Sequence, residues 1–260
     1  MAIHPTAIVH PNTRIADDVE IGPYVIIEEH VTIGRGTTIG PHTVIGSWTE
    51  IGENNTIFHM ASVGVAPQDL KYKGEACWTR IGNSNLIREF ATIHRGTVTG
   101  CSETVIGNNN LFMAYSHVAH DCRIGNDVVM ANAATLAGHV VVQDCVIIGG
   151  LSAIHQFVTI GSYVMLGGGS LVSNDVPPFM IVTTEGRDAK LRGLNLVGLK
   201  RRGFSEVTIA NLKKAYRVLY FSGLRQSEAL DALKADYPDC PEVMQLVSFI
   251  ESSERGVCKG

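Results

Sequence analysis

The sequence is poor in long apolar runs, in paired cysteines and in aromatic side chains. No apolar run among the 260 residues approaches the roughly 18 residues that cross a membrane, and the amino-terminal stretch lacks the basic and apolar regions of a signal peptide. We therefore expect no membrane span and no secretion. The six cysteines are scattered without a CxxC pair, which predicts reduced thiols in a cytoplasmic protein.

Charge is also sparse, at 18% of residues, and it is unevenly distributed. Residues 1–177 carry 8 Lys and Arg against 15 Asp and Glu, whereas residues 178–260 carry 13 against 10. The basic residues near the end are either ordinary solvated helix faces or a surface for an acidic partner or a phosphorylated substrate: Lys200, Arg201, Arg202, Lys213 and Lys214. A pI near 6.2 without aromatic–basic interleaving argues against nucleic acid as a partner.

What the chain has in abundance is a six-residue repeat. From Ile3 to Val63 every sixth residue is Ile or Val. This period fits neither a 3.6-residue helix nor the alternation of a strand, so it indicates a repeat architecture. The residue after the aliphatic one is often Gly, which suits a tight corner. Short strands joined by corners, with one aliphatic side chain per strand pointing inward, form a parallel β-helix.

The repeat is interrupted twice. Ile81, Ile87 and Ile93 keep the first phase, so the segment near 64–80 loops out and returns in register. The phase then shifts by one residue, and strict sixes run from Ile106 to Val172, which predicts a second excursion near 94–105. If three hexads close one triangular coil, the chain forms roughly nine coils about 4.8 Å apart.

The repeat stops at Pro177-Pro178, so we divide the chain into a β-helix over 1–177 and an α-helical domain over 178–260. Capping Ser residues and terminating Gly and Pro residues predict helices over about 194–202, 206–222, 227–237 and from 241 onward.

Histidine is concentrated in the later coils, at positions 94, 117, 120, 139 and 155. Since residues 18 apart stack in such a fold, His139 should lie beside the coil projection of His120. The cluster predicts either a zinc site or general-base chemistry. Gamma-type carbonic anhydrases also use histidines of a β-helix for zinc, but they space paired ligands as His-x4-His, whereas the nearest pair here is His117-x2-His120.

Six segments carry a family resemblance, in the same order along the chain: Gln68–Tyr72, Thr92–Thr97, His117–Cys122, Thr135–Val140, His155–Phe157 and Gly198–Phe204. The hexad is shared with many acetyltransferases, but HxAHDC together with LKRRGF is highly specific. Through these segments the chain closely resembles the UDP-N-acetylglucosamine O-acyltransferases that begin lipid A synthesis in Gram-negative bacteria.

The resemblance implies a left-handed parallel β-helix, a homotrimer, and active sites in clefts between neighbouring subunits. It also implies a reaction in which a 3-hydroxyacyl chain moves from a thioester on acyl carrier protein to the glucosamine 3-hydroxyl of UDP-N-acetylglucosamine. No metal or redox cofactor is expected.

The resemblance makes His120 the general base that removes the proton of the attacking hydroxyl. Asp121 could hold the imidazolium charge, although sequence neighbours on a strand face opposite ways, so this pairing requires a corner. Gly138, one coil after His120, would offer a backbone N–H to the oxyanion of the tetrahedral intermediate.

The resemblance also implies substrate-binding residues. Around the sugar and diphosphate we expect Gln68, Asp69 and Lys71, and around the acceptor His94, His117, His139, His155 and Gln156. The nucleotide end would meet Asn195, Arg201 and Arg202. Val197 stands where the best-known members carry an acidic residue, which weakens any uracil or ribose contact there. Gly168 matches the family's hydrocarbon ruler, and glycine leaves the groove open for a long donor such as 3-hydroxymyristoyl.

Three alternatives stand beside this function. The related UDP-3-O-acylglucosamine N-acyltransferase carries an extra amino-terminal uridine-binding domain, for which the hexads beginning at Ile3 leave no room. A non-enzymatic scaffold would not need a histidine cluster. A zinc-dependent hydratase is distinguished by metal analysis.

Overall fold

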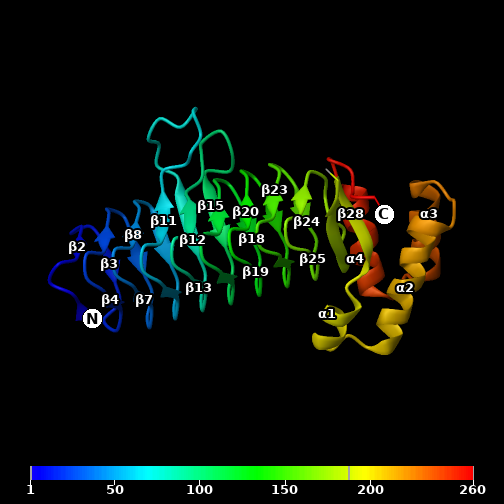
Figure 1. Ribbon diagram of the computed structural model, residues 1–260, viewed down its shortest axis with the longest axis horizontal. Helices are drawn as coiled ribbons and strands as arrows, with labels where there is room; N and C mark the ends of the chain where they lie inside the picture. The colour runs from blue at the N-terminus through cyan, green and yellow to red at the C-terminus, as the bar shows by residue number, and fades with distance from the viewer. Residues whose placement is uncertain (1, 187, 260) are drawn as a thin grey trace.

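The computed structural model describes residues 2–186 and 188–259 and shows a straight rod of stacked coils that ends in a group of helices (Figure 1). The strands belong to three sheets of 11, 9 and 8 strands, which form the sides of a triangular prism and are named A, B and C below. The chain visits them in the order A, B, C in each coil, and every pairing between coils is parallel.

The strands of the three sheets have the following bounds. Sheet A contains β1 (Ala2–Ile3), β4 (Glu20–Ile21), β7 (Thr38–Ile39), β10 (Thr56–Ile57), β13 (Leu86–Ile87), β16 (Leu111–Phe112), β19 (Val129–Met130), β22 (Ile147–Ile148), β25 (Met165–Leu166), β27 (Met180–Glu185) and β28 (Asp188–Leu194). Sheet B contains β2 (Ile8–Val9), β5 (Ile26–Ile27), β8 (Val44–Ile45), β11 (Ser62–Val65), β14 (Thr92–His94), β17 (His117–Val118), β20 (Thr135–Leu136), β23 (Ala153–Ile154) and β26 (Leu171–Val172). Sheet C contains β3 (Arg14–Ile15), β6 (Thr32–Ile33), β9 (Thr49–Ile51), β12 (Trp78–Ile81), β15 (Glu103–Ile106), β18 (Arg123–Ile124), β21 (Val141–Val142) and β24 (Thr159–Ile160).

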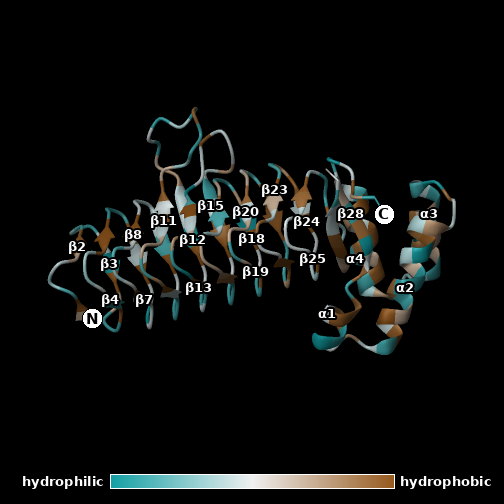
Figure 2. Ribbon diagram, in the orientation of Figure 1, coloured by the Kyte–Doolittle hydropathy of each residue, from teal (hydrophilic) through white to brown (hydrophobic). Residues whose placement is uncertain are grey.

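The hexad repeat places its aliphatic residue inside the prism. Ile21, Ile27 and Ile33, from three successive strands, are at most 2% exposed. Ile21 pairs with Ile39 of the next coil, which confirms that three hexads make one coil of eighteen residues. Figure 2 shows the resulting alternation of brown strands and teal turns along the rod.

The glycines that follow the aliphatic residues are needed for a different reason from the one expected. From the second coil onward, the left-handed backbone of most corners falls two residues later, on residues such as Tyr24 and His42, with φ near +57°. A Cβ on Gly34 would instead lie 2.6 Å from the carbonyl oxygen of Gly52 in the next coil. Glycine is therefore required by the close stacking of coils.

Two loops leave the prism, as the hexad phase predicts, and they lie on the same side of it (Figure 1). Ile51 pairs with Ile81 and Ile81 with Ile106, so these two coils carry twelve and seven residues beyond the standard eighteen. The strands continue slightly into the predicted excursions, so the loops themselves span 66–77 and 95–102.

The helical part follows a hairpin, β27–β28, that continues sheet A beyond residue 177. The helices are α1 (Leu196–Arg201), α2 (Glu206–Phe221), α3 (Gln226–Asp236) and α4 (Pro241–Ser252). α3 begins before the predicted Ser227, because Arg225 is its N-cap and donates its N–H to Glu228 at 3.0 Å. The division of the chain at residue 177 stays a prediction, since no comparison divides it there.

A single hydrophobic core runs from the second coil into the helices and the carboxy-terminal tail, from Val19 to Cys258. At the amino-terminal end β1, β2 and β3 have a neighbour on one side alone, and Ile8 is 66% exposed. Within residues 2–186 and 188–259, no helix is both long and apolar enough to cross a membrane.

Candidate active site

Most of the predicted site residues lie in or next to the turns between sheets, which form three corners of the prism: A–B, B–C and C–A. Strands β14, β17, β20 and β23 are consecutive neighbours in sheet B. Their ends and the turns that follow them place the clustered histidines on adjacent coils along corner B–C: His94, His117, His120, His139 and His155. The predicted convergence of imidazoles is therefore confirmed.

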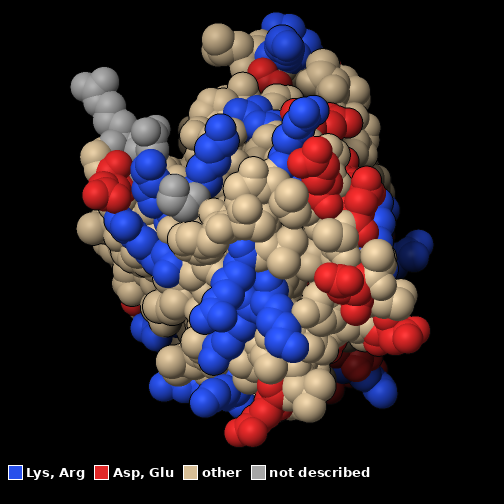
Figure 3. Space-filling model, turned by 90° about the vertical axis from the view of Figure 1, so that its right-hand side faces the viewer, with Lys and Arg blue, Asp and Glu red and all other residues tan. Residues whose placement is uncertain are grey.

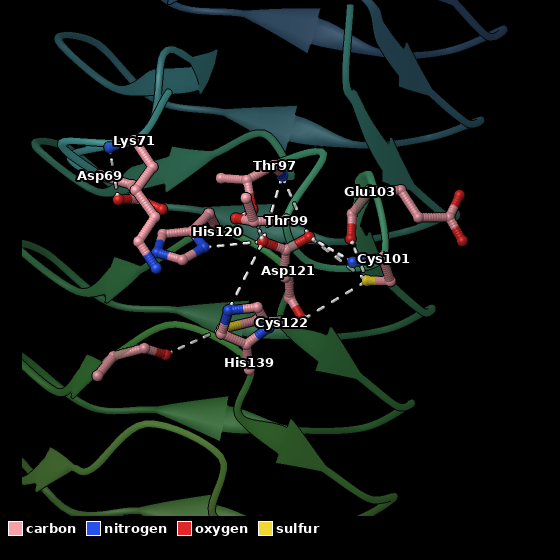
Figure 4. A network of polar contacts seen from close by, with 11 residues as sticks. Asp69, Lys71, Thr97, Thr99, Cys101, Glu103, His120, Asp121, Cys122 and His139 are labelled. Atoms are coloured by element: carbon pink, nitrogen blue, oxygen red, sulfur yellow. Dashed lines mark hydrogen bonds and ion pairs between the residues drawn. The ribbon is translucent and has the colours of Figure 1, made fainter. Parts of the chain in front are cut away.

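His120 and Asp121 form a hydrogen-bonded pair. Asp121 has a φ of +58°, and this left-handed turn swings its carboxylate back toward the preceding side chain. His120 Nδ1 lies 2.8 Å from Asp121 Oδ2 (Figure 4). The corner geometry that such a pairing requires is thus present.

Asp121 is a buried, ionised carboxylate. Its burial alone would raise its pKa, but hydrogen bonds from His120 and Thr97 overcome this effect and hold the pKa at about 2. An ionised carboxylate only accepts hydrogen bonds, so the His120 proton sits on Nδ1 and leaves Nε2 with a free lone pair. Nε2 is therefore able to act as a base.

His139 borders this pair from the next coil. Its ring meets that of His120 edge-on with centroids 5.1 Å apart, and it stacks on Phe157 at 4.5 Å. Burial lowers the pKa of His139 in spite of the nearby Asp121 charge. The side chain thus presents a neutral imidazole beside the base.

His94 and His117 form a second, more deeply buried pair with ring centroids 4.8 Å apart. His117 Nδ1 lies 2.7 Å from the Thr92 hydroxyl. Burial lowers the pKa of both imidazoles, and that of His94 falls to about 4. At neutral pH these groups are uncharged and suited to hydrogen bonding with hydroxyl groups.

Gly138 lies directly against His120. A Cβ at this position would be 2.6 Å from Cε1 and 2.8 Å from Nε2 of the imidazole, so no other residue fits without moving the ring. Among the described residues, no acceptor is hydrogen-bonded to its N–H. Pro23 and Pro41, which have no N–H, occupy the same hexad position elsewhere, so the fold does not use this donor.

Loop 66–77 brings two of the expected residues to corner B–C. Asp69 Oδ1 accepts the Lys71 N–H at 2.9 Å, and both residues lie on the same side as His120 in Figure 4. The Asp69 charge is near enough to His139 to counteract the lowering of its pKa. Gln68 lies on the same loop and is exposed.

Comparisons with known proteins identify the family. Residues 175–258 match the family model described as Udp N-acetylglucosamine O-acyltransferase, Domain 2, and residues 2–35 and 103–138 match Bacterial transferase hexapeptide (six repeats). The chain is 68% identical over 261 residues, all of both chains, to the acyl-(acyl-carrier-protein)–UDP-N-acetylglucosamine O-acyltransferase of Trichlorobacter lovleyi. The chain belongs to this family of O-acyltransferases.

Other relatives and solved structures carry names of the same kind. The Burkholderia orbicola protein of the same name is 55% identical over 99% of both chains. LpxA of Acinetobacter baumannii is 48% identical with a TM-score of 0.95 over 99% of this chain and 100% of that one. The Francisella novicida UDP-N-acetylglucosamine acyltransferase is 39% identical with a TM-score of 0.97 over 99% and 94%. The left-handed parallel β-helix is confirmed, and neither the N-acyltransferase nor the zinc hydratase is favoured.

Two other expected groups of this acyltransferase lie away from corner B–C. Arg201 and Arg202 are exposed near α1, on the opposite side of the rod from the two loops (Figure 1), and Arg202 lies 3.9 Å from Asp127 at corner C–A. Gly168 follows β25 at corner A–B. One chain therefore does not bring these residues to the histidines.

The Asn195 side chain is already engaged within the acyltransferase chain. It caps α1 by accepting the Gly198 N–H at 3.0 Å and donates to the Tyr163 carbonyl at 2.9 Å. Its contact with a nucleotide stays a prediction. Val197, in contrast, is 61% exposed.

His155 and Gln156 are exposed at the next coil along corner B–C. Arg255, from the carboxy-terminal tail, reaches His155 with 3.4 Å between Nη2 and Nδ1. The hexad pattern ends long before this tail, so the sequence held no signal for Arg255.

His120, Asp121 and His139 offer ligand atoms within 4.8 Å of one another, as a metal ion would need. The Asp121 oxygens, however, already accept hydrogen bonds from Thr97, Cys101 and His120. The Asp121 oxygens are thus already occupied by hydrogen bonds within the protein, and these three residues do not fit a metal centre. Thr97 and Cys101 are residues of this site that the sequence did not single out, although the segment of Thr97 was among those that resemble the family.

Proposed function

We propose that this O-acyltransferase moves a 3-hydroxyacyl chain from a thioester on acyl carrier protein to the glucosamine 3-hydroxyl of UDP-N-acetylglucosamine, the first step of lipid A biosynthesis. The observation that carries the proposal is the His120–Asp121 pair beside the unused Gly138 N–H. It occurs in a chain that aligns over its full length with relatives named for transfer from acyl carrier protein to that sugar nucleotide.

The geometry supports a general-base mechanism. His120 Nε2 takes the proton of the 3-hydroxyl as its oxygen forms a bond to the thioester carbonyl carbon. Asp121, 2.8 Å from Nδ1, stabilises the imidazolium that results. The Gly138 N–H is available to the oxyanion. When the tetrahedral intermediate collapses, the carbon–sulfur bond breaks, and the imidazolium returns its proton to the leaving thiolate of the carrier.

The other polar groups are suited to binding. His94, His117 and His139 are neutral donors or acceptors for the hydroxyl and amide groups of the sugar. Asp69, Lys71 and Gln68 reach the same corner from loop 66–77. Within this mechanism no step calls for a metal or redox cofactor, and we propose that none is used.

We propose a homotrimer with active sites between subunits. The histidines, the two arginines and Gly168 occupy three different corners of one chain. A complete site would therefore combine the histidine corner of one copy with the arginines or Gly168 of another copy. Corner A–B also carries an exposed apolar row that a neighbouring copy would cover: Tyr24, Met60, Phe90, Tyr115 and Leu151. The occupant of this row is a second copy of the same chain.

The helical end is suited to an acidic partner, and we propose acyl carrier protein in this role. Figure 3 shows Lys and Arg side chains gathered on this end of the molecule, which contains the exposed Lys200, Arg201, Arg202, Lys213 and Lys214. A basic surface attracts an acidic partner and speeds its encounter. Six free thiols are typical of a reducing compartment, so we propose that the reaction occurs in the cytoplasm.

The proposal is tested by an acylation assay with UDP-N-acetylglucosamine and a series of 3-hydroxyacyl carrier proteins. We expect an ester at the sugar 3-hydroxyl and release of free carrier thiol. UDP-3-O-acylglucosamine, whose 2-amine is free, serves as the competing acceptor. Acylation of that amine in preference to the hydroxyl would contradict the proposal, as would carrier thioester that remains intact. Sedimentation analysis of the purified protein tests the trimer separately.

A further inference from the structure

Loop 95–102 folds back onto the Asp121 carboxylate and surrounds it (Figure 4). Asp121 Oδ1 accepts the N–H of Thr97 at 3.1 Å and that of Cys101 at 2.9 Å. Asp121 Oδ2 accepts the Thr97 hydroxyl at 2.7 Å and lies 2.8 Å from His120 Nδ1. One loop therefore supplies every hydrogen bond to this carboxylate, among the described residues, other than the one from His120.

The donors are fixed in direction. Thr97 is 1% exposed and Asp121 3% exposed, so neither group exchanges its partner for water. The Thr97 hydroxyl has one proton, which goes to the carboxylate, so the Thr99 hydroxyl, 3.2 Å away, donates to Thr97 in turn. The oxygen that faces His120 is thus held by a chain of two threonines.

Close packing adds a steric restraint. A Cβ on Gly100 would lie 2.5 Å from both carboxylate oxygens, so the loop backbone rests directly on the Asp121 side chain. Removal of a donor or addition of a methyl group at this place therefore changes where Oδ2 points.

We propose that Thr97 is a positioning residue of the acyl transfer: its hydroxyl fixes Asp121 Oδ2 against His120 Nδ1, and this fixes the imidazole so that Nε2 faces the acceptor hydroxyl. The inference rests on the proposed function. Thr97 is 1% exposed, so we expect no contact with substrate, and it acts through Asp121. The competing possibility is that Asp121 merely anchors loop 95–102 to the coils, in which case Thr97 contributes to stability alone.

Thr97→Val keeps the shape of the side chain and removes the hydroxyl. We expect kcat to fall on the order of 10-fold to 100-fold, because a small displacement of a catalytic group slows the reaction strongly. KM for UDP-N-acetylglucosamine should stay near the wild-type value. Thr97→Ser restores the hydroxyl and should recover most of kcat. Gly100→Ala pushes the carboxylate and leaves every donor in place, so it should lower kcat as well.

Thr104→Val is the matched control. Thr104 is fully buried on β15, and its hydroxyl has no hydrogen-bond partner among the described residues. The substitution should leave kcat unchanged and thermal stability the same or higher.

A double-mutant cycle separates positioning from anchoring. In the Asp121→Asn background, Thr97→Val should cause little further loss of kcat, because the carboxylate it positions is gone. Wild-type kcat in Thr97→Val, or a full additive loss in the double variant, would overturn the inference while the wild-type enzyme remains active. A wild-type chain that fails to acylate UDP-N-acetylglucosamine would instead overturn the proposed function, and this inference with it.

Discussion

The contact of Asp121 with His120 depends on one backbone angle. Neighbouring side chains on a strand point to opposite faces, so His120 and Asp121 could not meet within a regular strand. The left-handed φ of +58° at the corner turns the carboxylate back onto the imidazole. Non-glycine residues adopt this region uncommonly, and Asp is among those that tolerate it.

His120→Ala tests the base directly. We expect turnover to fall by roughly 10²–10⁴, the usual contribution of a general base. The fold should persist, because His120 lies at a corner and not in the buried aliphatic rows. Turnover and the thermal midpoint are measured together, with His10→Ala in an early coil as the control. Near-normal turnover in the His120 variant would remove His120 from the mechanism.

His94 makes stability depend on pH. Burial lowers its pKa to about 4 in the folded chain, against about 6.5 when exposed. As pH falls from 6.5 to 4, the unfolded state binds a proton that the folded state excludes, so the free energy of unfolding falls by about 3 kcal/mol. His117 and His139, whose pKa values are also lowered, add to the loss in this acidic range. Urea unfolding at pH 7 and pH 4.5 measures it.

His94→Gln cannot take up this proton. Its loss of stability between pH 7 and pH 4.5 should be smaller than that of the wild type. An equal loss in both proteins would show that His94 is not the source.

At the scale of the elements, buried asparagines join consecutive coils at corner C–A. Asn85 donates to Asn55 Oδ1 at 3.0 Å and to the Gly107 carbonyl at 3.0 Å, and it accepts the Asn110 N–H at 3.0 Å. All three asparagines are at most 2% exposed. Their amides therefore satisfy backbone groups that water does not reach.

Asn85→Ala should destabilise the rod by about 3 kcal/mol, because it leaves several buried polar groups without partners at about 1–3 kcal/mol each. Asn83→Ala, at an exposed position of the same turn, is the control and should cost far less. Denaturant unfolding of both variants is the measurement. Similar losses in the two would mean that burial of the amide does not matter.

The coils were predictable because their signal is local and exact in spacing. Ile21 and Ile39 are eighteen residues apart, so their pairing could be counted from the sequence, and the same counting located both loops. Loop 95–102 has no period, so the contact of Thr97 with Asp121 depends on how a loop folds over a corner. The sequence predicted the neighbours of His120 along the coils and missed Thr97, which reaches Asp121 from the loop.

At the scale of the whole molecule, the site residues are divided among the three corners of the prism. Gly168 lies at corner A–B, and a Cβ there would meet the Gly150 carbonyl oxygen at 3.4 Å and nothing else within 4 Å. A long side chain at this position would therefore extend outward, toward the surface that the proposed trimer covers.

Gly168→Met tests the acyl-length ruler. The wild type should prefer 3-hydroxymyristoyl over 3-hydroxydecanoyl carrier protein, since each buried methylene contributes on the order of 0.8 kcal/mol. The Met side chain should occupy the end of the groove and reverse this preference. Rates with the two donors in competition measure it. If the Met variant keeps the wild-type ranking, the ruler lies elsewhere.

Charge at the helical end gives a further prediction. Replacing Lys200, Arg201 and Arg202 together by Gln should raise KM for the carrier, the UDP-sugar or both, and should flatten the salt dependence of the rate. Arg35→Gln, on an exposed coil position, is the control. Unchanged KM values with the wild-type response to salt would indicate an ordinary solvated face.

Glu20 and Thr38 occupy equivalent places in adjacent coils. Excision of residues 20–37 would thus join ends that already lie one above the other, and each remaining coil would still contact only its neighbours. A loss or gain that is not a multiple of six would turn the later aliphatic residues away from the interior, and one of six or twelve residues would move every later strand to another side of the prism, unless the surplus left the prism as a loop, as at 66–77 and 95–102. Insertion or deletion of one whole coil therefore changes the length of the rod and leaves every later corner in place, whereas other lengths are accommodated in loops such as those that carry Asp69 and Thr97.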